Sequence, residues 1–290
     1  MLRLYKYMSE DVALKFIKKP LLRLTPNWAL NDPFECKVAS TTNQKLNILD
    51  GNVERSIHTA DFMGLHGIVS LSETPDNLLM WSHYADEHKG AVVEFLIEGA
   101  DPLDMFNIGK CPTSSDAILG KVNYRKRRNY PFSVDVQSLD SIRTHYYLTK
   151  SDEWIYEKEH RFIIPGTEAS YMRSSNQGLY SDLELNNEGL DNFTLIQSVD
   201  TKQNLWKYSK ETQDMFFMDV HPRAIGRFII GCNGDLDLYK KAMKEGELSG
   251  LGKTFASSVF NKFCDVEVSK IHPERFELTF EPLMDQVNNS

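Results

Sequence analysis

The stretch Trp154-Ile-Tyr-Glu-Lys-Glu-His-Arg-Phe-Ile-Ile164 joins a charged, aromatic segment directly to an apolar run. The apolar run predicts a strand at residues 160–164. Glu157 and Glu159 lie two residues apart at the start of this strand, where alternate side chains point to the same face. We therefore expect both carboxylates to reach one cleft, where burial or crowding shifts pKa values and suits acids to act as bases or electrostatic stabilisers. The alternative is an exposed edge on which neighbouring cations pair with the acids.

Short apolar segments on both sides of this stretch predict the rest of the fold. Further strands are predicted at residues 2–7, 21–24, 67–72, 91–97, 121–124, 226–231, 265–270 and 276–281. Helices are predicted from an N-cap at Ser9 to Lys19, from a cap within residues 74–77 to Gly90, and at residues 138–149 and 236–245. The elements alternate without the regular rhythm of parallel βαβ units. The sequence therefore predicts an α+β fold with mixed or antiparallel central sheets flanked by helices.

The composition is that of a globular protein, with 41% hydrophobic and 26% charged residues. We expect residues 1–290 to form a single domain. Residues 166–210 are rich in Ser, Asn, Thr, Glu and Asp. We expect them to form a polar insertion, a lid or an excursion rather than part of the core.

The amino terminus and the cysteine spacing indicate the cellular compartment and the kinds of cysteine site to expect. The first residues lack the apolar core and cleavage site of a signal peptide, and no segment approaches the ~18 apolar residues of a membrane span. We therefore expect a cytoplasmic protein without membrane spans. The four cysteines form no Cys-x-x-Cys pair, so neither a zinc ribbon nor a disulfide framework is indicated.

A net charge of -8 argues against sequence-independent duplex binding, which depends on cations that neutralise phosphates. One local basic run, Lys121-Val-Asn-Tyr-Arg-Lys-Arg-Arg-Asn-Tyr130, places two tyrosines beside five cations. This run is either a contact for single-stranded nucleic acid, with the tyrosines stacked on bases, or a solvated loop.

Tyr5-Lys6-Tyr7 closes the first predicted strand. Alternation places both tyrosines on one face and Lys6 on the other. The motif therefore indicates either two core tyrosines with an exposed lysine or a cation flanked by aromatic rings at a binding site.

Asn31-Asp-Pro-Phe-Glu35 has the composition of a structured turn, because Asn31 or Asp32 can accept hydrogen bonds from nearby backbone amides. Glu35-Cys-Lys37 also imitates the acidic-x-Lys end of a metal nuclease site. Its companion acid would be Asp32, which is too close in sequence to lie on a separate strand.

Trp81, Tyr84 and His88 recur at helical spacing and are expected to share one face of a helix. Such a face either packs into the core or forms a wall for a planar or cationic ligand.

In this order, the motifs resemble a bacterial family known as domain of unknown function 2971. Its pattern runs Tyr-Lys-Tyr, Asn-Asp-Pro-Phe-Glu, Met-Trp-Ser-His-Tyr-Ala with His-Lys-Gly, Tyr-Glu-Lys-Glu-His-Arg and a late Ile-Ile-Gly strand. The match extends from Leu4 to about Leu278. Met8 departs from the pattern, which has an arginine after Tyr-Lys-Tyr.

The layout is also similar to that of ADP-ribosyltransferase-like proteins, which implies a split β-sandwich and NAD as a co-substrate. The resemblance implies a toxin or antiviral effector that modifies a nucleic acid or a protein, with an antitoxin or defence partner. It implies that Glu159 stabilises an oxocarbenium-like ribose and that Glu157 orients or deprotonates the acceptor. It also implies that Tyr84 or Trp81 stacks on nicotinamide and that Lys6 or another cation meets the pyrophosphate. The residues expected to hold NAD are Lys6, Tyr7, Asn31, Phe34, Trp81, Ser82, His83 and Arg161.

Two other functions remain open at this point. A metal-dependent nuclease would use the acids of the motifs, which are Asp32, Glu35, Glu157 and Glu159. A non-enzymatic sensing or interaction domain would bury the motif aromatics and pair the acids with Lys158 and Arg161.

Overall fold

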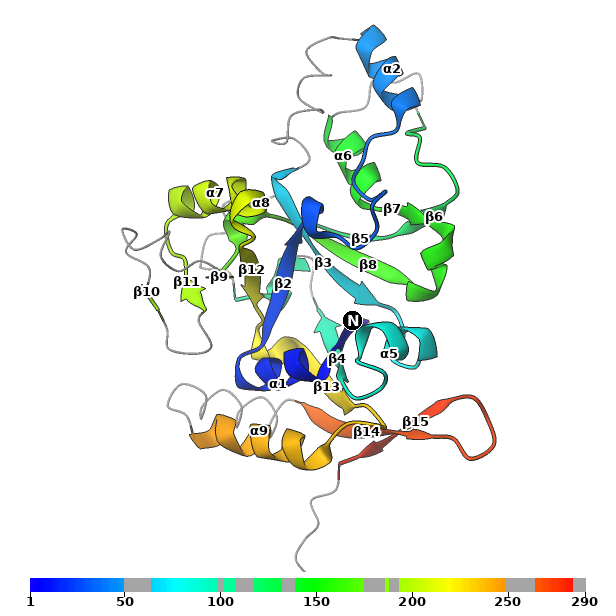
Figure 1. Ribbon diagram of the computed structural model, residues 1–290, viewed down its shortest axis with the longest axis vertical. Helices are drawn as coiled ribbons and strands as arrows, with labels where there is room; N and C mark the ends of the chain where they lie inside the picture. The colour runs from blue at the N-terminus through cyan, green and yellow to red at the C-terminus, as the bar shows by residue number, and fades with distance from the viewer. Residues whose placement is uncertain are drawn as a thin grey trace, which may run out of the picture.

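The computed structural model describes residues 1–49, 64–98, 102–107, 117–131, 139–174, 186–187, 193–248 and 264–283. These residues form one mixed sheet of 13 strands, a separate pair of strands, and helices that lie against them (Figure 1). The α+β fold with a mixed sheet that the sequence predicts is therefore confirmed.

The strands of the large sheet lie in the order β10-β11-β9-β12-β2-β3-β1-β4-β13-β14-β15, with β8 on the second edge of β3 and β5 beyond β8. They pair antiparallel except for β13 and β14, which are parallel. Their bounds are β1 (Leu2–Met8), β2 (Leu21–Pro26), β3 (His66–Ser72), β4 (Ala91–Ile97), β5 (Ile118–Lys121), β8 (Glu159–Pro165), β9 (Tyr171–Arg173), β10 (Asn186–Asn187), β11 (Thr194–Leu195), β12 (Met215–Asp219), β13 (Ile225–Ile230), β14 (Asp265–Ile271) and β15 (Leu278–Pro282).

The separate pair consists of two parallel strands, β6 (Asn123–Arg125) and β7 (Thr149–Ser151). The α-helices are α1 (Glu10–Lys18), α2 (Ser40–Leu49), α5 (Leu78–Tyr84), α6 (Leu139–Tyr147), α7 (Val199–Lys207), α8 (Ser209–Thr212) and α9 (Leu236–Leu248). Short 3-10 helices are η1 (Asn27–Ala29), η2 (Pro102–Met105), η3 (Asp152–Glu157), η4 (Gly166–Glu168) and η6 (Pro222–Ala224).

The sheet divides at β3, and this division positions the candidate site. One edge of β3 pairs with β8 from end to end. The other edge is shared, because β2 pairs with it at Gly67 and Ile68 whereas β1 pairs with it only where Tyr5 meets Ser72. Residues 69–71 therefore have neither strand beside them on that edge. An opening remains between β1 and β2, which α1 connects (Figure 1).

The first strand has the alternation that its sequence predicts. Leu4 and Met8 belong to the main hydrophobic core, whereas Tyr5 and Tyr7 pack on the opposite face in a smaller cluster. Lys6 is half-buried and lies at the opening in the sheet, so the expectation of an exposed lysine is wrong.

The described part of residues 166–210 contributes to the core, which corrects the expectation that this segment lies outside it. Met172 in β9 and two residues of α7, Leu205 and Trp206, belong to the main hydrophobic core. The Trp206 ring packs against Phe216, with 4.8 Å between ring centroids. The polar average composition of the segment conceals these few apolar side chains, which β9 and α7 contribute to the core. Residues 175–185 and 188–192 lie outside the described residues.

Helix α5 is shorter than its sequence predicts. It begins after Asn77, whose side chain accepts hydrogen bonds from two backbone amides, and it ends at Tyr84 instead of continuing to Gly90. The backbone turns sharply afterwards, and three consecutive residues, Asp86, Glu87 and His88, adopt positive φ angles. This turn brings Gly90 against β1, where a Cβ atom would lie 2.0 Å from the Met8 carbonyl oxygen. Helical spacing therefore does not relate His88 to Trp81, although their rings stack at 5.9 Å.

The segment predicted as one strand at residues 121–124 belongs to two strands. It ends β5 and begins β6, and the buried Val122 lies between them. The amide of Val122 donates a hydrogen bond to the Glu159 carbonyl oxygen at 2.9 Å, which fixes this bend beside β8.

Candidate functional site

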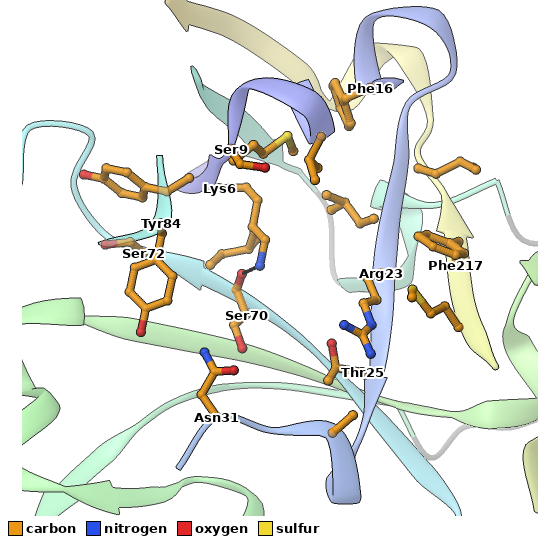
Figure 2. A pocket seen from close by; sticks show the side chains of 18 of the residues that line it. Lys6, Ser9, Phe16, Arg23, Thr25, Asn31, Ser70, Ser72, Tyr84 and Phe217 are labelled. Carbon is orange, nitrogen blue, oxygen red and sulfur yellow. Dashed lines mark hydrogen bonds between the residues drawn. The ribbon is translucent and has the colours of Figure 1, made fainter. Parts of the chain in front are cut away.

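A cavity of about 570 Å³ lies at the opening between β1, β2 and β3 (Figure 2). Helix α1 lines it together with β1 and β2, and the free edge of β3 contributes Ser70 and Leu71. Side chains from α5, η3, β7 and β8 also reach it. The four sequence motifs, which are widely separated along the chain, each contribute residues to this one cavity.

Lys150, in the middle of β7, joins three carboxylates. Its Nζ lies 2.6 Å from Glu157 Oε2, 3.2 Å from Glu35 Oε1 and 3.4 Å from Glu159 Oε2. All three acidic side chains are at most 5% exposed. Burial alone would lower the pKa of Lys150, but the carboxylates outweigh burial and raise it. The ammonium group therefore remains charged at neutral pH.

Arg161 in β8 completes this charged group and is itself buried. It binds both oxygens of Glu159, with distances of 2.8 Å from Nε and 2.9 Å from Nη2. It also donates to Glu35 Oε1 and to the Tyr147 carbonyl oxygen, each at 2.7 Å. Burial alone would raise the pKa of Glu159, but Arg161 and Lys150 hold it at about 2. Glu159 is therefore an anion with both oxygens engaged.

Glu157 differs from Glu159 in its proton affinity. Its Oε1 accepts a hydrogen bond of 2.6 Å from the Tyr84 hydroxyl, and its Oε2 faces Lys150. Burial raises the pKa of Glu157 more than Lys150 lowers it, and the nearby Glu159 raises it further. Burial and Glu157 also raise the pKa of Tyr84, so its phenol stays protonated and remains the donor. Glu157 is thus a buried carboxylate at the cavity that accepts a proton more readily than an ordinary glutamate.

The two carboxylates converge by a different route from the one that strand alternation predicts. Glu157 is the last residue of η3, and Lys158 after it adopts a left-handed backbone conformation with φ 46°. This turn redirects the chain before Glu159 begins β8. Both acids nevertheless meet at Lys150.

Lys6 enters the cavity from β1. Its Nζ donates a hydrogen bond of 2.9 Å to the carbonyl oxygen of Ser70, on the free edge of β3 (Figure 2). Burial lowers the pKa of Lys6, and Glu159 and Glu157 counteract this only in part. Lys6 therefore donates a hydrogen bond to a backbone carbonyl oxygen of β3 that has no strand partner on this edge. Its ammonium charge lies at the cavity.

Most residues that we expected to hold NAD line the cavity. Those that line it are Lys6, Tyr7, Asn31, His83 and Arg161. The three catalytic candidates, Glu157, Glu159 and Tyr84, line it as well.

Three expected cofactor residues do not line the cavity. Trp81 is completely buried, donates its indole N–H to the Pro75 carbonyl oxygen at 2.7 Å, and stacks on His88. Ser82 is exposed on α5, and Phe34 is 59% exposed on the surface. Trp81 therefore serves core packing, and the other two side chains face solvent outside this cavity.

The acids named for a metal-dependent nuclease do not form a metal site. Asp32 stays apart and accepts a hydrogen bond from the Phe34 amide at 2.8 Å, which fits the turn-forming role. The other three bind Lys150 and Arg161, which occupy the positions next to their oxygens. Within the described ranges, no group of three or more His, Cys, Asp or Glu side chains is placed to hold a metal ion.

The residue that sequence reasoning missed is Lys150. It belongs to none of the quoted motifs and follows a segment that reads as a helix. The sequence indicates Lys150 only indirectly, because three acids buried at one place require more positive charge than Arg161 alone provides. The alternative that pairs the acids with Lys158 and Arg161 is confirmed for Arg161, whereas Lys158 is exposed and forms no ion pair with them among the described residues.

The basic run lies close to this site, and its two tyrosines are buried or partly buried. The Tyr124 hydroxyl accepts a hydrogen bond of 2.8 Å from the Glu159 amide, and Tyr130 is buried. Arg128 donates to the carbonyl oxygens of Phe34 and Lys37. Tyr130 is therefore not available for stacking on bases, whereas Tyr124 is partly exposed and its hydroxyl binds the backbone of β8.

Comparison with known proteins gives one finding. Residues 80–162 match the model of the family described as Protein of unknown function (DUF2971). The matched segment contains Tyr84, Lys150, Glu157, Glu159 and Arg161. Neither a curated protein nor a solved structure matches the chain.

No helix among the described residues is long and apolar enough to cross a membrane. The family match confirms the resemblance that the motifs indicate, over the part of the chain that supplies most of the charged group. The match over residues 80–162 therefore supports the family described as Protein of unknown function (DUF2971) as the one that this part of the chain resembles.

Proposed function

We propose that the chain is an NAD-consuming enzyme that transfers ADP-ribose, with the cavity at the division of the sheet as its active site. The observation that carries the proposal is that Lys6 from the first strand, Tyr84 from α5 and Glu157 before β8 line the same cavity. This is the order of a basic residue, an aromatic residue and a late acid that the resemblance to ADP-ribosyltransferase-like proteins implies.

The charge of the site supports this reaction. Three carboxylates face two buried cations, so the group carries one negative charge in excess when all members are ionised. Cleavage of the bond between nicotinamide and ribose passes through an oxocarbenium-like sugar cation, which a nearby carboxylate stabilises. The excess negative charge also attracts the cationic nicotinamide ring before the bond breaks.

The reaction assigns a different role to each residue. The Tyr84 ring forms a wall for nicotinamide, which leaves with the electrons of the broken C–N bond. The acceptor attacks the ribose carbon, and Glu157 takes the acceptor's proton because its pKa is raised. Glu159 acts as a positioning residue in place of the direct role first expected of it, because Arg161 binds both of its oxygens in a buried ion pair and its pKa is held at about 2, whereas the pKa of Glu157 is raised.

The test is transfer of label from NAD carrying a radioactive adenylate group to the contents of a bacterial lysate. We expect transfer, or release of nicotinamide, with the wild type and a loss of about 100-fold or more in Glu157→Gln. Glu153→Gln, an exposed position in the same 3-10 helix, is the matched control and keeps full activity. Full activity in a folded Glu157→Gln would overturn the proposal.

The same experiment identifies the acceptor. Label that nuclease digestion releases belongs to a nucleic acid, and label that protease releases belongs to a protein. Either acceptor suits the role of a toxin or an antiviral effector that the resemblance implies.

A second candidate function is a ligand-sensing domain without catalysis. The observation that favours it is that every carboxylate of the charged group has a cationic partner within 3.2 Å. Under this function the folded wild type neither releases nicotinamide nor transfers label. Substitution of Glu159 would then impair function only to the extent that it lowers the melting temperature.

A further inference from the structure

Strands β2, β9 and β12 line the cavity with a different set of side chains. Arg23 in β2 pairs with Phe217 in β12, which pairs with Tyr171 in β9, and Met215 pairs with Arg173 in the next row. Paired residues of neighbouring strands point to the same face, and residues two apart along a strand do so too. Two arginines and an aromatic ring therefore face this part of the cavity together.

The cations of this part of the cavity form no ion pair with any carboxylate that the structure describes. Among the described residues, no carboxylate lies within ion-pairing distance of Lys6, Arg23 or Arg173, and Lys6 has the Ser70 carbonyl oxygen as its partner. Lys15, by contrast, is paired with Asp11 at 2.7 Å. Positive charge thus converges on the opening between β1 and β2, where an anion would be held without displacing an existing ion pair.

Lys6 and Arg23 line the same part of the cavity. Figure 2 shows Lys6 from β1 and Arg23 from β2 on opposite sides of the opening, with Thr25 beside the guanidinium group. Burial lowers the pKa of both cations, and the charge of Arg23 contributes to the shift of Lys6. A doubly charged anion between them would relieve this repulsion.

An aromatic surface adjoins these cations. The Phe217 ring lies edge-on to Phe193, with 4.9 Å between centroids, and both side chains line the cavity. Phe217 is only partly buried, so part of its ring is accessible. Aromatic side chains of this kind stack on nucleobases without requiring a particular base.

We infer that this part of the cavity binds a nucleoside diphosphate group, with Arg23 and Lys6 on the diphosphate and Phe217 against the base. The inference rests on the proposed function, since it orients NAD with its ADP half at β2 and β12 and its nicotinamide ribose toward Glu157. Phosphate recognition by side chains replaces the glycine-rich loop of the dinucleotide-binding fold, whose Gly-x-Gly-x-x-Gly pattern the sequence lacks.

The test is calorimetric titration of the full chain with ADP, inorganic pyrophosphate and adenosine. Each charge-assisted hydrogen bond to phosphate contributes about tenfold or more to affinity. We therefore expect Arg23→Gln to lower the affinity for ADP and pyrophosphate at least about tenfold and to leave the affinity for adenosine unchanged. Phe217→Leu should weaken ADP and adenosine but not pyrophosphate. Arg223→Gln, at an exposed arginine outside the cavity, is the matched control and should change nothing.

Binding equilibrium separates this inference from the proposed function, because none of these ligands reacts. One outcome is that Arg23→Gln weakens ADP binding while the wild type releases no nicotinamide from NAD. This outcome supports the subsite and refutes the transferase. Nicotinamide release with unchanged ADP affinity in Arg23→Gln refutes the subsite alone. Failure of ADP to bind the folded wild type at millimolar concentration also overturns the inference.

Discussion

Replacement of Arg161 by methionine tests how strongly the buried charged group stabilises the fold. Arg161 is 1% exposed and donates four hydrogen bonds, two to Glu159, one to Glu35 and one to the Tyr147 carbonyl oxygen. Methionine fills much of the same volume but donates none of these bonds. Among the described residues, Lys150 then remains as the cation within 4 Å of all three buried carboxylates.

The expected loss of stability is about 3–5 kcal/mol, because removal of one partner leaves uncompensated charge in the interior. The pKa of Glu159 agrees in sign and order of magnitude, because Arg161 and then Lys150 hold it at about 2 instead of its ordinary value of 4.5. That difference corresponds to about 3 kcal/mol of stabilisation of the ionised carboxylate in the fold. Most domains have a total stability of about 5–15 kcal/mol, so the variant should unfold at much lower urea concentrations.

Urea unfolding monitored by tryptophan fluorescence measures this loss. A depressed pKa contributes stability above the unfolded value of 4.5, and the contribution disappears as pH falls toward 2. The difference between wild type and Arg161→Met should therefore be largest at neutral pH and become smaller below pH 4.5. The control Arg223→Met should stay within about 0.5 kcal/mol of the wild type.

Two results would refute the reasoning about Arg161. One is a loss below about 1 kcal/mol at neutral pH, which is typical of a solvent-screened pair. The other is a difference that does not change with pH. The double variant Glu159→Gln/Arg161→Met should be less destabilised than the sum of the single variants, since each removes the other's partner.

Three further predictions concern the site and the core. Tyr84→Phe removes the donor to Glu157 and should reduce nicotinamide release about tenfold or more, with a loss of only about 1 kcal/mol in urea unfolding. The pKa of Glu157 is raised, so Glu157 should become protonated at a higher pH than an ordinary glutamate. The acidic limb of the pH–rate profile should therefore lie above the ordinary glutamate value, and a profile without this shift would count against Glu157 as the base. Gly166→Ala places a Cβ atom 2.1 Å from the Trp206 ring and should cost about 1–3 kcal/mol, whereas an unchanged melting temperature would contradict that packing.

Local sequence was sufficient for the elements near the site. The alternation in β1 and the apolar run of β8 predict their strands within one residue at most ends, because side-chain periodicity determines which face is buried. The end of α5 could not be predicted in this way. Its position depends on the close contact of Gly90 with the Met8 carbonyl oxygen, which is a tertiary contact.

The candidate site was partly predictable for a similar reason. The motifs name Lys6, Tyr84 and Glu157, but nothing in their spacing indicates that β1 and β2 separate along β3 to create the cavity. Lys150 and Arg23 lie outside the motifs, and their relevance appears only when strand pairing brings them to the cavity. The same limit explains why Trp81 was considered as a ligand wall, since helical spacing alone does not separate a core face from an accessible one.

The most direct test of the central claim is a crystal structure of the Glu157→Gln variant soaked with NAD, in which slowed turnover should preserve the dinucleotide. The proposed arrangement predicts NAD in the cavity at the division of the sheet, with nicotinamide against Tyr84 and the diphosphate within hydrogen-bonding distance of Lys6 and Arg23. NAD bound elsewhere on the chain, or a cavity that stays empty at saturating NAD, would contradict it.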